Sequence, residues 1–187
     1  TQNTKDIYVI MKISEKTDVR KNLLKTRKSL NKAFIEYHSN HIIVQILEDP
    51  NFINSNNIGI YLPVNNELDL TRLLSLKGKT FYVPKTVDDE IIFVEITKET
   101  PLIKGPYQID EPASGEVAEK IDYLITPSLA IYQNRRLGYG GGYYDKYISK
   151  NRPTFVVGVI YDFQEVEFKY DDLDELLDYY FVSKKEI

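Results

Sequence analysis

The sequence of 187 residues contains no cysteine, and this absence excludes several chemistries at once. Without thiols the chain cannot form disulfides, use a thiolate nucleophile, or hold zinc or an iron–sulfur cluster through cysteine. Histidine is also scarce: His38 and His41 are the only two, and we expect both to be partly exposed between or within N-terminal helices. No Gly-x-Ser-x-Gly segment is present. No enzyme nucleophile is therefore apparent in the sequence. The lack of cysteine also suits a reducing cytoplasm, where we expect the protein to act.

Long apolar runs are missing as well. None approaches the roughly 20 residues that span a bilayer, and Ile7–Met11 is too short for the apolar part of a signal peptide. The net charge of −4 argues against a nucleic-acid binder, and the basic stretch Lys16–Lys32 lacks interleaved aromatic residues. That stretch is either a solvated helix face or a neighbour of an anion site. We expect a monomer with small-molecule partners and no membrane or nucleic-acid partner.

Glycine is infrequent, but it is concentrated in one place. Of nine glycines, Gly138, Gly140, Gly141 and Gly142 fall in the segment Arg136–Asp145, which reads RLGYGGGYYD. Glycine adopts positive φ without penalty and lets the backbone approach a ligand closely. Amides of such a loop together with Arg136 can hold phosphate oxygens, and Asp145 can hold a magnesium ion. The segment therefore predicts a nucleoside triphosphate site, although a flexible turn covered by tyrosines would have a similar composition.

The apolar pattern indicates alternating helices and strands. Strand, glycine-rich loop, helix and strand follow one another from residue 121 to 160, which predicts a βαβ unit with the loop at the carboxyl end of a strand. Residues 1–15 are expected to be a leader, with Met11 as an alternative start, and residues 16–187 to form one domain. The expected helices are 18–37 with Asp18 as N-cap, a second one through 42–47, a short one from Asp69, and 143–149; the expected strands are 58–62, 79–83, 91–96, 121–125, 155–160 and 179–182, with 51–57 as a surface loop.

Two segments together resemble the 5-formyltetrahydrofolate cyclo-ligase family, also called methenyltetrahydrofolate synthetases. They are Thr126-Pro127-Ser128-Leu129-Ala130 and the ten residues from Arg136 to Asp145. Weaker motifs follow in the same order from about Lys16 to the C-terminus. The resemblance implies a three-layer α/β/α sandwich with a mostly parallel central sheet, in agreement with the βαβ pattern. The chain departs from the family at Ile131-Tyr132, at Asn134-Arg135 and at Lys146.

The resemblance also implies roles for individual residues. ATP would be bound by Lys16 and Arg20, which stand one helical turn apart, and by the segment Arg136, Leu137, Gly138, Tyr139, Gly140, Gly141, Gly142, Tyr143 and Tyr144. The folate would be bound by Glu67, whose carboxylate can accept pterin N–H donors, and by Leu62. Magnesium would be held by Asp145 and Asp174, with Asp171 and Asp172 as alternatives to the latter. Arg136, Asp145 and Tyr144 are the expected catalytic residues, while Glu111 is expected to be structural or to support the residues that touch the ligands.

The family activity is the ATP- and Mg²⁺-dependent conversion of 5-formyltetrahydrofolate to 5,10-methenyltetrahydrofolate, with release of ADP and phosphate. The formyl oxygen is a poor leaving group until it is phosphorylated, after which N10 can close the ring. Such a reaction needs positioning and charge stabilisation rather than an enzyme nucleophile. Two alternatives remain from the sequence: a kinase-like enzyme on the same scaffold, and a non-catalytic folate or nucleotide sensor. Tyr143 and Tyr144 would stack on the pterin, close over the phosphates, or simply pack.

Overall fold

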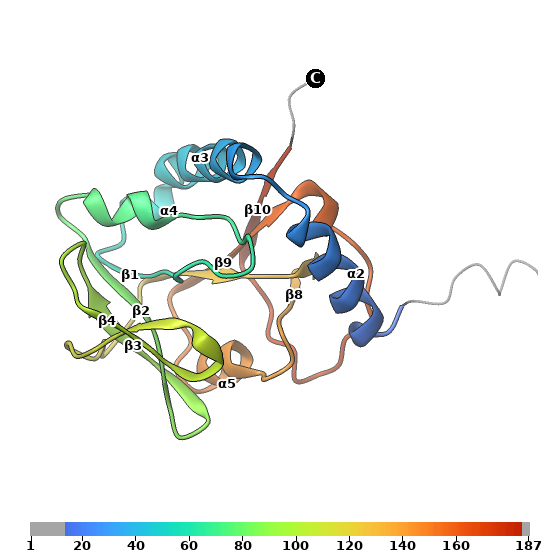
Figure 1. Cartoon of the computed structure of the whole chain (residues 1–187). Helices are drawn as coiled ribbons and strands as arrows, with labels where there is room; N and C mark the ends of the chain where they lie inside the picture. The colour runs from blue at the N-terminus through green and yellow to red at the C-terminus, as the bar shows by residue number, and fades with distance from the viewer. Residues whose placement is uncertain (1–13, 185–187) are drawn as a thin grey trace, which may run out of the picture.

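A six-stranded sheet forms the centre of the computed structural model, which describes residues 14–184 (Figure 1). The strand order is β10-β9-β6-β1-β2-β3, and every neighbouring pair is parallel except the β2–β3 hairpin. The strands run over Asn57–Gly59 (β1), Thr80–Val87 (β2), Glu90–Ile96 (β3), Tyr123–Pro127 (β6), Phe155–Tyr161 (β9) and Tyr179–Ser183 (β10). Consecutive apolar residues in β6 and β9 are buried, as expected for strands covered on both faces.

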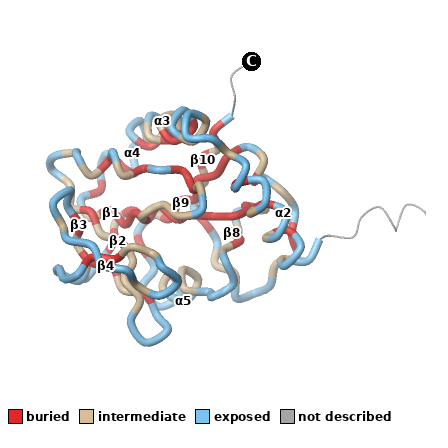
Figure 2. The backbone as a smooth tube through the Cα atoms, viewed as in Figure 1, coloured by how far each residue is buried: buried red, intermediate tan, exposed pale blue. Residues whose placement is uncertain are grey.

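Helices cover both faces of the sheet, so the expected three-layer sandwich is confirmed. Helix α3 (Lys32–Glu48) and the short α4 (Pro50–Ile53) lie over one face, and α5 (Tyr143–Lys150) lies under the other (Figure 1). Ile42 and Ile46 of α3 belong to one buried cluster, and Ile148 of α5 belongs to a second. Burial is strongest along the central strands and on the side of α3 that faces them (Figure 2). None of the described helices is long and apolar enough to cross a membrane.

The break between the first two helices lies at different residues from those expected. The structure has α2 over Lys16–Lys28 and α3 from Lys32, so the predicted helix 18–37 is interrupted at Ser29–Asn31. Asn31 has extended backbone angles and its side chain accepts the Phe34 N–H at 2.8 Å, which makes it an N-cap. The expectation for Asp18 was also wrong, because α2 begins at Lys16 after Glu15. Apart from Ser14 and Glu15, the expected leader lies outside the described residues.

We expect Asn31→Ala to lower the free energy of unfolding by about 1 kcal/mol, since it removes the side-chain acceptor at the start of α3. Chemical denaturation followed by circular dichroism measures the change. Asn22→Ala, at an exposed site within α2, is the matched control and should not destabilise the protein. An unchanged midpoint for Asn31→Ala would show that the cap contributes nothing.

The βαβ unit is confirmed, with an additional hairpin inside it. Strands β6 and β9 are parallel neighbours, and α5 lies between them in the chain. The hairpin of β7 (Ala130–Tyr132) and β8 (Arg135–Leu137) precedes the glycine-rich loop. A second hairpin, β4 (Leu102–Lys104) with β5 (Asp110–Pro112), was also not predicted. Three short 3₁₀ helices complete the described elements: Thr71–Ser75, Pro106–Gln108 and Asp162–Gln164.

Several smaller expectations need correction. The predicted loop 51–57 contains most of α4, and the helix expected from Asp69 is a 3₁₀ turn in which the Asp69 carboxylate accepts the Thr71 N–H at 2.9 Å. His38 is buried instead of partly exposed, because it turns toward β10, where its Nδ1 lies 2.6 Å from the Ser183 hydroxyl. His41 is partly exposed as expected.

Candidate functional site

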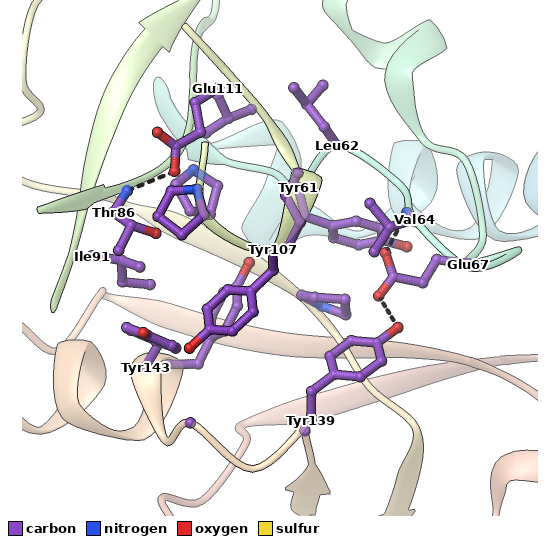
Figure 3. A pocket seen from close by; sticks show the side chains of 18 of the residues that line it. Tyr61, Leu62, Val64, Glu67, Thr86, Ile91, Tyr107, Glu111, Tyr139 and Tyr143 are labelled. Atoms are coloured by element: carbon purple, nitrogen blue, oxygen red, sulfur yellow. Dashed lines mark hydrogen bonds between the residues drawn. The ribbon is translucent and has the colours of Figure 1, made fainter. Parts of the chain in front are cut away.

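A cavity of about 550 Å³ opens where β1, β2 and β6 reach their carboxyl ends (Figure 3). Tyr61 follows β1, Val83 and Thr86 belong to β2, and Pro127 ends β6. Open parallel sheets bind ligands at this edge. The glycine-rich loop and the segment before β5 form further walls. The sequence-predicted residues in the lining are Leu62, Glu67, Arg136, Gly138, Tyr139, Gly141, Gly142, Tyr143 and Tyr144.

The glycine-rich loop joins β8 to α5 and forms one wall of this cavity. Gly140 and Gly142 have φ values of 114° and 66°, which residues with a Cβ rarely adopt. Gly138 makes a close approach instead: a Cβ there would lie 3.1 Å from Nη2 of Arg136, so a larger residue would have to displace this guanidinium slightly. Gly142 is the N-cap of α5 and supplies no side-chain acceptor, so backbone N–H groups at the start of this helix are available to a ligand.

Glu67 is the buried carboxylate of the cavity. Its side chain is only 5% exposed, and its Oε2 accepts the Val64 N–H at 2.9 Å. Its Oε1 accepts the Tyr139 hydroxyl at 2.9 Å (Figure 3). Burial raises the pKa of Glu67, while these hydrogen bonds and the nearby Arg27 oppose the rise. A buried acceptor with unused lone pairs suits a ligand that presents N–H donors.

The sequence does not single out Arg27, which it shows only as one of the cations in the basic stretch Lys16–Lys32. Only 1% of this arginine is exposed, because α2 buries one face through Val19, Leu23 and Arg27. Its Nε donates to Asn65 O at 2.9 Å, and its Nη2 donates to the Tyr139 hydroxyl. The spacing of four residues was a usable signal, since Arg27 continues the apolar stripe of the helix.

Arg136 lies under the loop rather than on the surface. Its Nε and Nη2 both donate to Pro127 O, at 2.9 and 2.6 Å, and its guanidinium lies 4.7 Å from the centre of the Tyr144 ring. Burial lowers the pKa of Arg136, and the charge of Asp145 is the main opposing effect. Burial also raises the pKa of Tyr144, so this phenol is neutral and acts as a hydrogen-bonding and packing group.

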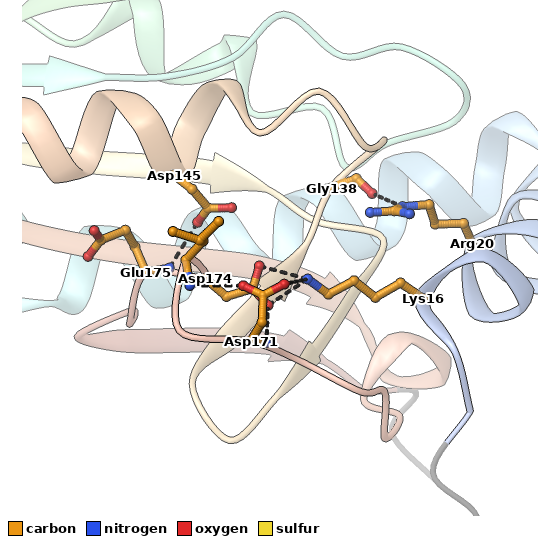
Figure 4. A network of polar contacts seen from close by, with 8 residues as sticks. Lys16, Arg20, Gly138, Asp145, Asp171, Asp174 and Glu175 are labelled. Carbon is orange, nitrogen blue, oxygen red and sulfur yellow. Dashed lines mark hydrogen bonds and ion pairs between the residues drawn. The ribbon is translucent and has the colours of Figure 1, made fainter.

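A second group of charged residues gathers on the other side of the loop (Figure 4). Arg20 donates through Nε to Gly138 O at 2.8 Å, and its guanidinium carbon lies 3.8 Å from the position a Cβ of Gly140 would take. Lys16 donates to Asp174 at 2.6 Å and to the exposed Asp171 at 3.4 Å. Asp145 Oδ1 accepts the Glu175 N–H at 3.0 Å. Helix α2, the loop, α5 and the acidic C-terminal segment thus meet at one point.

Asp145 fits a magnesium ion better than Asp174 does. Burial raises the pKa of Asp145, with Arg136 opposing, and only one of its oxygens accepts a described hydrogen bond. Both oxygens of Asp174 are engaged by Lys16. Within residues 14–184 no three acidic or histidine side chains form a complete metal cage. Magnesium bound to a nucleotide needs only one or two protein carboxylates, because phosphates and water complete its shell.

The remaining sequence-predicted residues have simpler surroundings. The Leu137 side chain is buried in the core beside Leu129 and Val19, away from the cavity. Glu111 accepts the Thr86 N–H at 2.9 Å and pairs with Lys85, as expected for a structural role, and it also lines the cavity. Tyr61, Ile91 and Tyr107 line the cavity without having been predicted, because apolar and aromatic residues of strands and loops have no distinctive pattern.

Comparison with known proteins gives one consistent family. The profile of the 5-formyltetrahydrofolate cyclo-ligase family matches residues 12–178. A 5-formyltetrahydrofolate cyclo-ligase of Mycoplasma genitalium is 29% identical over 175 residues, covering 88% of this chain and 95% of that protein. The solved structure of Aquifex aeolicus 5,10-methenyltetrahydrofolate synthetase has a TM-score of 0.80 and 31% identity, covering 91% of this chain and 90% of that one. The Mycoplasma pneumoniae synthetase has a TM-score of 0.70 and 26% identity, covering 88% and 96%.

Proposed function

The chain belongs to the 5-formyltetrahydrofolate cyclo-ligase family, and we propose from this premise that it uses ATP and Mg²⁺ to convert 5-formyltetrahydrofolate to 5,10-methenyltetrahydrofolate. One observation carries the proposal. The glycine-rich loop lies between a cavity that contains a buried carboxylate, Glu67, and a charged group formed by Lys16, Arg20 and Asp145. A folate in the cavity and a triphosphate on the loop would place their reacting atoms at this shared wall.

Folate recognition is assigned to the cavity side. The Glu67 carboxylate has lone pairs left after accepting from Val64 and Tyr139, so it can accept N–H groups of the pterin. Leu62 and the rings of Tyr61 and Tyr144 supply apolar surface for the flat ring system. Burial strengthens each of these polar contacts because water does not compete for them.

Triphosphate binding is assigned to the loop side. Loop amides and the start of α5 can donate to phosphate oxygens, and Arg20 and Lys16 supply positive charge. Asp145 would hold the magnesium ion, with Asp174 beside it; the ion, when bound, offsets phosphate charge and orients the nucleotide. Arg136 lies beneath the loop, where its positive charge stabilises negative charge on the transferring group.

The chemistry balances without a protein nucleophile. The formyl oxygen attacks the terminal phosphorus of ATP, and ADP leaves. N10 then attacks the activated formyl carbon and gives up its proton to the departing phosphate, and the carbon–oxygen bond breaks to release inorganic phosphate. The former formyl oxygen ends in that phosphate, and the formyl carbon bridges N5 and N10. The protein contributes alignment and charge stabilisation to both steps.

Absorbance of the methenyl product tests this proposal. Purified protein mixed with 5-formyltetrahydrofolate, ATP and Mg²⁺ should produce the methenyl chromophore, and omission of ATP or of the metal should abolish it. A kinase would instead consume ATP and leave a stable phosphorylated product. A sensor would bind folate or nucleotide in calorimetry without turnover. Either result would reject the proposal.

Arg20→Met should raise the KM for ATP by about tenfold, because it removes a charged donor from the loop. We expect the KM for 5-formyltetrahydrofolate to change much less, since Arg20 is not part of the cavity lining. Lys21→Met, at the adjacent exposed position of α2, is the control and should leave both constants near their original values. If both substitutions raised the KM for ATP equally, the effect would come from the overall charge of the helix and not from the contact of Arg20 with the loop.

A further inference from the structure

The Tyr139 hydroxyl connects two buried charges of opposite sign. It accepts from Nη2 of Arg27. It donates to Oε1 of Glu67 at 2.9 Å (Figure 3). Three separate segments meet through this one atom: helix α2, the turn 63–67 after β1, and the glycine-rich loop. Tyr139 itself is 46% exposed as a residue, so packing of the whole side chain does not account for the position of its hydroxyl.

These contacts fix the orientation of the Glu67 carboxylate. Val64 N–H binds Oε2 and the Tyr139 hydroxyl binds Oε1, so each carboxylate oxygen carries one protein donor. A carboxylate has about four acceptor positions, and one on each oxygen therefore remains for a ligand. Two donors on a planar ligand can occupy these positions together, as in the bidentate pairs that fix orientation.

Two further hydrogen bonds join Arg27 to the turn that precedes Glu67. Its Nε donates to Asn65 O, and its own backbone oxygen accepts from the Asn66 side chain at 2.8 Å. Arg27 thus holds the turn that precedes Glu67 from two directions. A hydroxyl that accepts from a guanidinium becomes a better donor to a carboxylate, because hydrogen bonds in a chain polarise one another.

We propose that Arg27 and Tyr139 are positioning residues, which act through Glu67 to orient the folate and to couple its binding to the position of the glycine-rich loop. This inference rests on the proposed function, because it takes the folate as the ligand of Glu67. Tyr139 was predicted as an ATP-binding residue, whereas its hydroxyl contacts the folate side of the loop. The pair therefore links the two halves of the site.

Charges around Glu67 give the pair a measurable signature. Arg27 from α2 and Arg136 from β8 face it with positive charge, and the phenols of Tyr61, Tyr139, Tyr144 and Tyr161 surround it. Since burial already raises the pKa of Glu67, loss of the Arg27 charge should raise it further. Folate binding needs the ionised carboxylate. As the pH is lowered, folate affinity would therefore be lost at a higher pH than in the unaltered protein.

Tyr139→Phe is the mildest test, because it removes one oxygen atom. We expect the Kd for 5-formyltetrahydrofolate, measured by calorimetry without ATP, to rise about tenfold, as for loss of one hydrogen bond to a charged group. Tyr179→Phe, at an exposed tyrosine of β10, is the matched control and should not change the Kd. An unchanged Kd in Tyr139→Phe would overturn the proposal.

Two Arg27 variants separate positioning from mere stability. In Arg27→Met, the acid limb of the affinity profile, which is the pH range where folate affinity falls on acidification, should move to higher pH. In Arg27→Lys, which keeps the charge, this range should stay near that of the unaltered protein. Loss of thermal stability without movement of the limb would reduce Arg27 to a structural role. If Arg27→Met does not fold, Tyr139→Phe still decides. A protein that binds the folate but yields no methenyl product would refute the proposed function while leaving this test intact.

Discussion

Asp145→Asn should lower kcat about 100-fold while the protein stays folded. Asparagine keeps an oxygen that can accept the Glu175 N–H, so the local hydrogen bond survives and only the charge is lost. The loss of one electrostatic contact in a phosphoryl-transfer site typically costs on the order of 3 kcal/mol in the transition state. Turnover at saturating ATP and folate measures the effect, and the Mg²⁺ concentration needed for half-maximal rate should rise.

Stability should not fall together with activity. The pKa of Asp145 is raised in the folded protein, chiefly by burial, so its ionised form opposes folding at neutral pH. A raised acid pKa gives a stability contribution that is present at low pH and is lost as pH rises through the folded value. Asparagine removes that penalty, and the melting temperature should not fall.

The control for this prediction is Asp88→Asn, in the exposed turn between β2 and β3. The left-handed φ of 48° at this position suits asparagine as well as aspartate. Neither kcat nor the requirement for Mg²⁺ should change. Near-normal turnover of Asp145→Asn would remove Asp145 from the catalytic residues.

Glu67→Gln should weaken 5-formyltetrahydrofolate binding by about 100-fold. The substitution keeps the size of the side chain but removes its charge and replaces one acceptor oxygen by a donor group. Two or more charge-assisted hydrogen bonds to the ligand would be lost or weakened, each worth about 1.5–3 kcal/mol. Calorimetry gives the Kd, and Glu99→Gln, at an exposed site, is the control.

The pH dependence of folate affinity provides a second check on Glu67. Because burial raises its pKa, the carboxylate becomes protonated at a higher pH than an ordinary glutamate. Affinity should therefore be full above the folded pKa and should fall as pH decreases through it. This decrease should be absent in Glu67→Gln. A parallel decrease in both proteins would assign the titration to the ligand or to another residue.

The layered fold was predictable because its strongest signals are local. The apolar runs of β6 and β9, the helix after Gly142 and the order of these elements sufficed for the βαβ unit. The boundary between α2 and α3 was less visible, because the apolar periodicity continues across it. Asn31 decides the boundary by capping α3, and an asparagine between two helical patterns is a weak signal beside that periodicity.

Side-chain burial was harder to predict than residue type. Arg27 stands among lysines that are exposed, and only its register with Val19 and Leu23 distinguishes it from them. Its partners, Asn65 O and the Tyr139 hydroxyl, lie 38 and 112 residues away in the chain. Contacts at such separations depend on the tertiary fold. The sequence therefore identified most residues of the proposed site but not the bond that joins Glu67 to the loop.

Oxygen isotope transfer tests the central claim most directly. Substrate carrying oxygen-18 in its formyl group should be incubated with protein, ATP and Mg²⁺, and the released phosphate analysed by mass spectrometry. Activation of the formyl oxygen by phosphoryl transfer predicts one labelled oxygen in each inorganic phosphate that accompanies a methenyl product. Methenyl product formed with unlabelled phosphate, and with the label in water instead, would contradict it.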